Sequence, residues 1–189
     1  MCLLKKQETL TYMKSDTYDI AINQIQNWEN PDLLYEAARI VKKDTGDSII
    51  SVYYCKNAYQ KFGYHFGLMR LNENEIGVVH DDLYLNLSNT NVNAFDALLM
   101  HEVGHYINGD MDNQIDDLEI RQERVLQILK GKVAPNELEA DRFAVEHCGK
   151  NAVMQMLDIV IATRKKRNTA DGEIALKELE LRKQAVKRM

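Results

Sequence analysis

Apolar and polar residues follow three successive patterns along the 189-residue chain, and each pattern predicts a different kind of structure. In the first, apolar residues recur at the helical spacing of three and four over residues 33–41, directly after Asn30-Pro31-Asp32. Asparagine is a good helix cap and proline fits the first helical position, so we expect a helix that begins there and ends at Gly46. Another helix is expected over residues 19–28. The first pattern therefore predicts an N-terminal helical segment over residues 1–47.

Short runs rich in β-branched and aromatic residues replace this pattern from residue 48 onward. Asparagine, glycine and aspartate separate the runs, and these residues favour turns. The runs predict a small, mostly antiparallel sheet that ends near Leu87, with strands in SIISVYYC, YHFGLMRL, IGVV and LYLNL.

After the segment SNTNVN, the rest of the chain has helical periodicity. The Asn and Thr side chains of this segment are natural helix caps, and the glycines at 109, 131 and 149 stand where helices are expected to end. Strands followed by helices predict an α+β fold with a helical C-terminal half. The expected helices cover residues 93–108, 114–130, 136–148, 150–165 and 172–187.

The composition predicts a soluble cytoplasmic protein. Hydrophobic residues make up 45% and charged residues 28% of the chain, as in ordinary globular proteins. No apolar run approaches the ~18 residues of a membrane span, and MCLLKKQETL lacks the apolar stretch of a signal peptide. Cys2, Cys55 and Cys148 are scattered without a CxxC pair, which predicts reduced thiols.

Charge is distributed unevenly between the last helix and the rest of the chain. The net charge of −5 makes no strong case for nucleic-acid binding, but residues 164–189 alone carry +5. A solvated helix face is the simpler interpretation of this basic C-terminal helix, and an anionic partner is the alternative. We expect residues 48–163 to form the functional core without help from residues 164–189.

The segment LLMHEVGHYINGD places a histidine, a glutamate and a second histidine within five positions of an expected helix. Residues four apart lie on one helical face, so His101 and His105 can present ring nitrogens to one metal ion. Glu102 lies slightly aside, where its carboxylate can accept a proton from a zinc-activated water. This HExxH spacing predicts a catalytic zinc site with Glu102 as general base.

Gly104 lies inside the same expected helix. A glycine in a helix interior costs about 1 kcal/mol relative to alanine. Its presence indicates that another segment approaches the helix backbone closely at this point.

A zinc site with two histidines needs a further ligand, and PNELEADRFAVEHCG offers two glutamates. Glu137 and Asp141 share one helical face, so one can bind the metal while the other supports a ligating imidazole. Glu139 has a competing role, because it can close a capping box on Asn136 if that residue is the helix cap. We therefore favour Glu137 as the third ligand over Glu139.

Taken together, HEVGHxxNGD and NELEADRFAVEHCG resemble the gluzincin metalloproteases, most closely the soluble relatives of CaaX-prenyl and HtpX-type endopeptidases. The resemblance covers about residues 76–160. It implies a zincin-like fold, with the third ligand at Glu137 and a supporting carboxylate at Asp141. The chain is also similar to ImmA/IrrE-type regulatory metallopeptidases, which carry a related pair of motifs.

The resemblance further implies that one zinc ion serves the hydrolysis of a peptide or protein substrate. In gluzincins, an edge strand before the metal helix binds the substrate by strand addition, and EIGVVHDDLYLNL occupies that place here. His80 within this segment is a candidate for a cleft residue that steadies an oxyanion. Two alternatives remain open at this stage: a regulatory protease that cleaves one partner, such as a repressor, and a non-catalytic interaction module that contains zinc.

Overall fold

The structure is a computed structural model that describes residues 25–26, 33–43, 46–72, 75–82, 84, 87, 90–110, 118–167 and 172–189. The chain divides into two compact units, residues 1–85 and residues 86–189, and this division falls inside the segment 48–163. The first unit contains a small mixed sheet, and the described residues from 92 onward are mostly helical. The prediction of an α+β chain with a helical C-terminal half is confirmed. None of the described helices is both long enough and apolar enough to span a bilayer.

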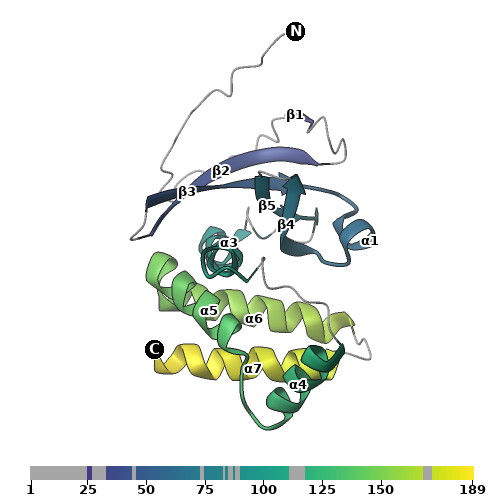
Figure 1. Cartoon of the computed structure of the whole chain (residues 1–189), viewed down its shortest axis with the longest axis vertical. Coiled ribbons are helices and arrows are strands. Elements are labelled where there is room, and N and C mark those ends of the chain that lie inside the picture. Colours follow the sequence, from purple (N-terminus) through teal and green to yellow (C-terminus); the bar gives the residue numbers. More distant parts are fainter. Residues whose placement is uncertain are drawn as a thin grey trace. The chain divides into compact units, whose positions relative to one another are not determined.

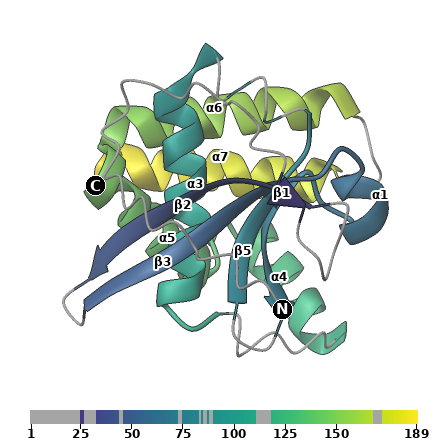
Figure 2. The same ribbon diagram turned by 90° about the horizontal axis from the view of Figure 1, so that it is seen from above.

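The sheet of the first unit has five described strands in the order β1-β2-β3-β5-β4. Three of the four pairings are antiparallel, and β3 pairs with β5 in parallel. The long hairpin of β2 and β3 is prominent in Figure 2. The elements of this unit are β1 (Ile25–Gln26), β2 (Leu34–Lys43), β3 (Gly46–Tyr54), α1 (Ala58–Phe62), β4 (Phe66–Asn72) and β5 (Glu75–His80).

The helix expected after Asn30-Pro31-Asp32 is wrong, because Leu34–Lys43 is strand β2. Its backbone pairs with β3 along its length, and the register shifts between Tyr35 and Ala37. Such a bulge interrupts the alternation of apolar and polar residues that identifies a strand, so the apolar spacing resembles that of a helix. Of the helix expected over residues 19–28, the described residues 25–26 form strand β1, and the others lie outside the described residues.

The sheet ends at His80 rather than near Leu87. Tyr84 and Leu87, which we expected in a last strand, have helical backbone, and the N–H of Asn91 donates to the carbonyl of Leu87. The expected edge strand is also wrong. Strand β5 lies between β3 and β4, so both of its edges are already paired. A peptide therefore cannot add to β5 by simple strand pairing.

A small apolar cluster stabilises the first unit where β3 runs into α1. The backbone N–H of Cys55 donates to the carbonyl of His80 (2.8 Å), which joins the end of β3 to the end of β5. Phe62, Tyr64 and Met69 pack against this cluster, whose buried members are Leu33, Tyr53, Cys55, Ala58 and Val79.

The second unit consists of helices in the described residues, shown in teal to yellow in Figure 1. Their positions agree with the sequence prediction to within a few residues, although residues 111–117 lie outside the described part. The side chain of Asn91 accepts a hydrogen bond from the Ala94 N–H and caps the first of them, as expected from SNTNVN. The helices are α3 (Val92–Ile107), α4 (Leu118–Leu129), α5 (Pro135–Cys148), α6 (Lys150–Arg167) and α7 (Gly172–Arg188).

Helices α3 and α5 approach each other closely at Gly104, as its place in the sequence predicted. A Cβ atom at this position would lie 2.9 Å from the Cα and 3.2 Å from the carbonyl oxygen of Ala140. The neighbours are mostly backbone atoms, which cannot rotate away as a side chain can. Only glycine therefore allows this spacing, and that spacing sets how near the side chains of α3 come to those of α5.

We predict that Gly104→Ala lowers the free energy of unfolding. Helix propensity alone would stabilise the variant by about 1 kcal/mol, but forcing extra volume into this contact costs ~1–3 kcal/mol. Urea unfolding followed by far-UV circular dichroism measures the difference. Ala162→Gly, the reverse exchange at an exposed position of α6, calibrates the propensity effect. A Gly104→Ala protein more stable than the wild type would contradict the close approach.

Candidate metal centre

Two histidines of α3 point their ring nitrogens at the same place. His101 and His105 are one helical turn apart, and their Nε2 atoms lie 3.1 Å from each other. His101 is buried and His105 is half-buried. The expected one-turn arrangement of the two imidazoles is therefore present in the structure.

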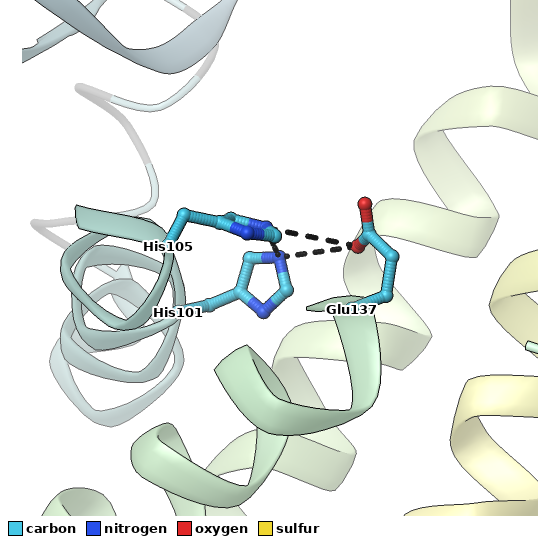
Figure 3. A group of neighbouring side chains, drawn as sticks. All are labelled: His101, His105 and Glu137. Carbon is cyan, nitrogen blue, oxygen red and sulfur yellow. Dashed lines mark hydrogen bonds and ion pairs between the residues drawn. The ribbon is translucent and has the colours of Figure 1, made fainter. Parts of the chain in front are cut away.

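Glu137, in the first turn of α5, completes the group (Figure 3). Its Oε2 atom lies 3.5 Å from Nε2 of His101 and 3.9 Å from Nε2 of His105. Zinc bonds of ~2.0–2.2 Å in a tetrahedral site place ligand atoms roughly 3.3–3.6 Å apart. The three distances of 3.1, 3.5 and 3.9 Å bracket this range, so these side chains could hold a small ion. Oε2 of Glu137 also lies 2.8 Å from Nη1 of Arg182. The structure itself does not identify the ion.

Glu139 does not compete for this role, although it was considered. The helix cap of α5 is Ala134, with Pro135 at the first helical position, so Asn136 already lies inside the helix. The expected capping box between Asn136 and Glu139 is therefore wrong. Proline has no backbone N–H to satisfy, which is why it suits the first position and sets the start of the helix one residue earlier. The side chain of Glu139 is exposed.

A carboxylate lies within hydrogen-bonding distance of the Nδ1 atom of each imidazole, on the other side of the ring from Nε2. Oδ1 of Asp141 lies 3.0 Å from Nδ1 of His101, and Oδ2 of Asp110 lies 2.8 Å from Nδ1 of His105. A ring whose Nδ1–H donates to a carboxylate leaves the Nε2 lone pair free for a metal. The structure thus brings Asp141 to the place expected for a supporting residue, and adds Asp110, which we did not anticipate.

The end of α3 explains how Asp110 reaches His105. Asp110 N–H donates to the His105 carbonyl, and Gly109 N–H donates to the Tyr106 carbonyl, with Gly109 at a φ of 78°. These are the two bonds of a Schellman motif, which folds the chain back over the last helical turn. We predicted Gly109 as a helix end but did not follow the motif to the next residue, where the acidic side chain could have been recognised.

Arg182 of α7 neutralises the carboxylates of α5. Its Nη1 lies 2.8 Å from Oε2 of Glu137, and its Nε and Nη2 donate to the two oxygens of Asp141 at 2.8 and 2.6 Å. Burial raises the pKa of both carboxyls, but the arginine charge and the neighbouring histidine outweigh burial and hold both pKa values below their usual range. Both groups therefore carry negative charge in the folded protein.

His101 is subject to opposing influences from the same groups. Burial and the charge of Arg182 lower the pKa of the imidazole. Hydrogen bonds to Asp141 and Glu137 raise it by more, and the resulting pKa is about 9. In the metal-free protein, the imidazole of His101 therefore holds its proton more tightly than a free imidazole, and a metal ion would have to replace the proton on Nε2.

A second arginine ties α4 to the same carboxylate. Nη2 of Arg124 lies 2.8 Å from Oε1 of Glu137, and its guanidinium also donates to Glu178 of α7. Helices α4, α5 and α7 are thus joined by one ionic network. Its members are Arg124, Glu137, Asp141, Glu178 and Arg182.

The expectation that residues 164–189 contribute nothing to the site is therefore wrong. The positive charge of the segment as a whole gives no sign that Arg182 is buried. Leu179, Arg182 and Val186 are buried together on α7, at spacings of three and four. A charged residue on the apolar stripe of an amphipathic helix was the feature that could have identified Arg182.

Two other candidates are not among the three converging side chains. Glu102 is half-buried on α3, beside His101 in sequence. His80 belongs to the first unit, where its side chain is fully buried and its ring lies 6.0 Å from those of Tyr54 and Phe66. This environment favours a structural role for His80, and its role as a cleft residue stays a prediction.

Comparison with known proteins gives no further guide to the role of this site, since no protein-family model, no curated protein and no solved structure matches the chain. What the site does must be argued from its residues.

We predict that Asp110→Asn weakens zinc binding by roughly 10–100-fold, the usual effect of removing a carboxylate that supports a ligating histidine. Competition against a chromophoric chelator measures the affinity. Asp158→Asn removes an exposed carboxylate that pairs with Lys183 on the outside of the same unit and serves as control. Equal affinities for the two variants would show that Asp110 does not support His105.

Proposed function

We propose that this protein is a zinc-dependent metallopeptidase of the gluzincin type. The observation that carries the proposal is the convergence of His101, His105 and Glu137, from two helices, at ligand-to-ligand distances of 3.1, 3.5 and 3.9 Å. Two imidazoles, a carboxylate and an open position are the ligand set of catalytic zinc, whereas structural zinc sites are closed by four protein ligands. The resemblance of the two motifs to gluzincins supports the same function.

Each residue has a distinct role in the proposed reaction. His101, His105 and Glu137 would hold the ion, which when bound lowers the pKa of water and polarises the carbonyl of a peptide bond. Glu102 accepts a proton from the attacking water and returns it to the leaving amine. Asp141 and Asp110 keep the imidazoles in the tautomer that presents Nε2.

The ligand assignment predicts how zinc content responds to substitution. The purified protein should contain about one zinc per chain, and His101→Ala or His105→Ala should remove it. Glu137→Gln should weaken binding because an anionic ligand becomes neutral, whereas Glu139→Gln should have little effect because that side chain is exposed. Elemental analysis after dialysis measures all four variants.

Two results would contradict this assignment. One is stoichiometric zinc in a protein that lacks both histidines. The other is loss of zinc from Glu139→Gln but not from Glu137→Gln. Circular dichroism spectra of each variant serve as the control for folding.

The role of Glu102 predicts that Glu102→Gln abolishes turnover without loss of zinc. Glutamine has the same size but cannot accept a proton, and a positioned general base contributes ~10²–10⁴ in rate. Cleavage of casein by the wild type and the variant, each with its zinc content measured, tests this. An unchanged rate in a zinc-loaded variant would place the base elsewhere.

The choice of substrate separates the proposed activity from a more selective one. A general peptidase should cleave an unfolded protein such as casein. A regulatory protease of the ImmA/IrrE type should leave casein intact and cleave one partner, and its Glu102→Gln variant should fail on that partner.

A further inference from the structure

Helix α7 introduces a single positive charge among buried carboxylates. Arg182 is 8% exposed, beside Asp141 at 0% and Glu137 at 9%. Its guanidinium spans the two acidic residues, with one nitrogen on Glu137 and two on Asp141. One side chain therefore contacts both acidic residues on this face of α5.

Such an arrangement compensates a large energetic penalty. Glu137 and Asp141 are one helical turn apart, so their like charges repel each other, and burial deprives both of water. A metal ion bound by Glu137 would offset the negative charge of the two carboxylates, but the chain must fold before that ion can bind. Until then, a buried carboxylate without a partner costs several kcal/mol of stability.

Other basic groups also contact these carboxylates. The ring of His101 lies 3.0 Å from Asp141 and 3.5 Å from Glu137, but the proposed function assigns it to the metal. Arg124 contacts Glu137 as well, but its side chain is 41% exposed and its charge is shared with Glu178. It makes no contact with Asp141 in the ion pairs found here. Arginine also suits the position of residue 182 better than lysine, because a planar fork can satisfy two carboxylates at fixed angles.

We propose that Arg182 is an internal counter-ion that holds Glu137 and Asp141 in place before metal binds, so that the second unit folds without the metal. The inference rests on the metal site of the proposed function. It sets this site apart from structural zinc sites, whose domains unfold when the metal is removed. A unit that folds first can lose and regain its metal reversibly, and its activity can follow the supply of zinc.

Thermal unfolding of the full chain tests this role, followed at 222 nm in excess EDTA and again in excess zinc. The wild type should unfold cooperatively in EDTA. Arg182→Met should lower the midpoint in EDTA by roughly 10–20 °C, the effect of breaking a buried ion pair in a unit of this size. Zinc should raise the midpoint of Arg182→Met by more than that of the wild type. In EDTA, the unfolding midpoint of Arg182→Lys should lie between those of the wild type and Arg182→Met.

A charge-rescue experiment distinguishes the role of Arg182 as a counter-ion from the effect of its side-chain packing. Asp141→Asn should lower the EDTA midpoint of the wild type, because it removes one of the two carboxylates that pair with the arginine. It should raise the midpoint of Arg182→Met, because there it removes a buried charge that has lost its arginine. Lys183→Met is the matched control. It changes the neighbouring residue of α7 and removes an ion pair with the largely exposed Asp158 of α6, so it should change the midpoint little.

The outcomes that overturn the proposal are specific. It fails if Arg182→Met unfolds in EDTA at the midpoint of Lys183→Met, or if Asp141→Asn lowers the midpoint equally in both backgrounds. If Arg182→Met does not fold at all, the folding of the double variant Arg182→Met/Asp141→Asn is compared with that of Asp141→Asn alone. A folded double variant supports the counter-ion, and an unfolded one overturns it. If zinc shifts no midpoint, the metal site fails instead, while the sign of the Asp141→Asn effect still decides the role of Arg182.

Discussion

The contact between Gly104 and Ala140 is the constraint on which the candidate site depends. His101 precedes Gly104 by three residues, and Glu137 precedes Ala140 by three residues, so each ligand lies about one turn from the contact on its own helix. A larger residue at position 104 would push the helices apart through backbone atoms that cannot yield. The distances between imidazole and carboxylate are thus set by packing, so the proposed metal ligands are already positioned in the folded chain.

Electrostatics imposes a second condition on the same pair of helices. Packing brings two carboxylates of α5 into a buried environment, and burial of charge is favourable only when partners and hydrogen bonds are supplied. The partners come from α4, the helix that precedes α5, and from α7, whose Arg182 lies 41 residues beyond Asp141 in the chain. The second unit therefore needs all of these helices for a stable site, although only α3 and α5 carry the proposed ligands. Loss of one arginine affects stability and metal geometry together, because both depend on the same contacts.

The sequence was informative wherever chemistry and local periodicity coincide. The spacing of His101 and His105, the acidic segment of α5 and the helix ends at glycines follow from rules that act within a few residues. Strand β2 could not be recognised in this way, because its bulge interrupts the alternation and its stability comes from pairing with β3. Arg182 was missed because its partners are 41 and 45 residues away in the chain. Asp110 could have been identified, because the Schellman motif that positions it begins with a glycine that was recognised.

Asp110 is attached to His105 twice, through its backbone N–H to the carbonyl oxygen and through its carboxylate to the ring. Helix ends normally fray, since their last carbonyls have no partner within the helix. Here the same residue that satisfies the end of α3 also fixes the orientation of an imidazole. The final turn of α3 therefore cannot open without releasing that ring, so local unfolding at the helix end and loss of the proposed ligand His105 would be a single event.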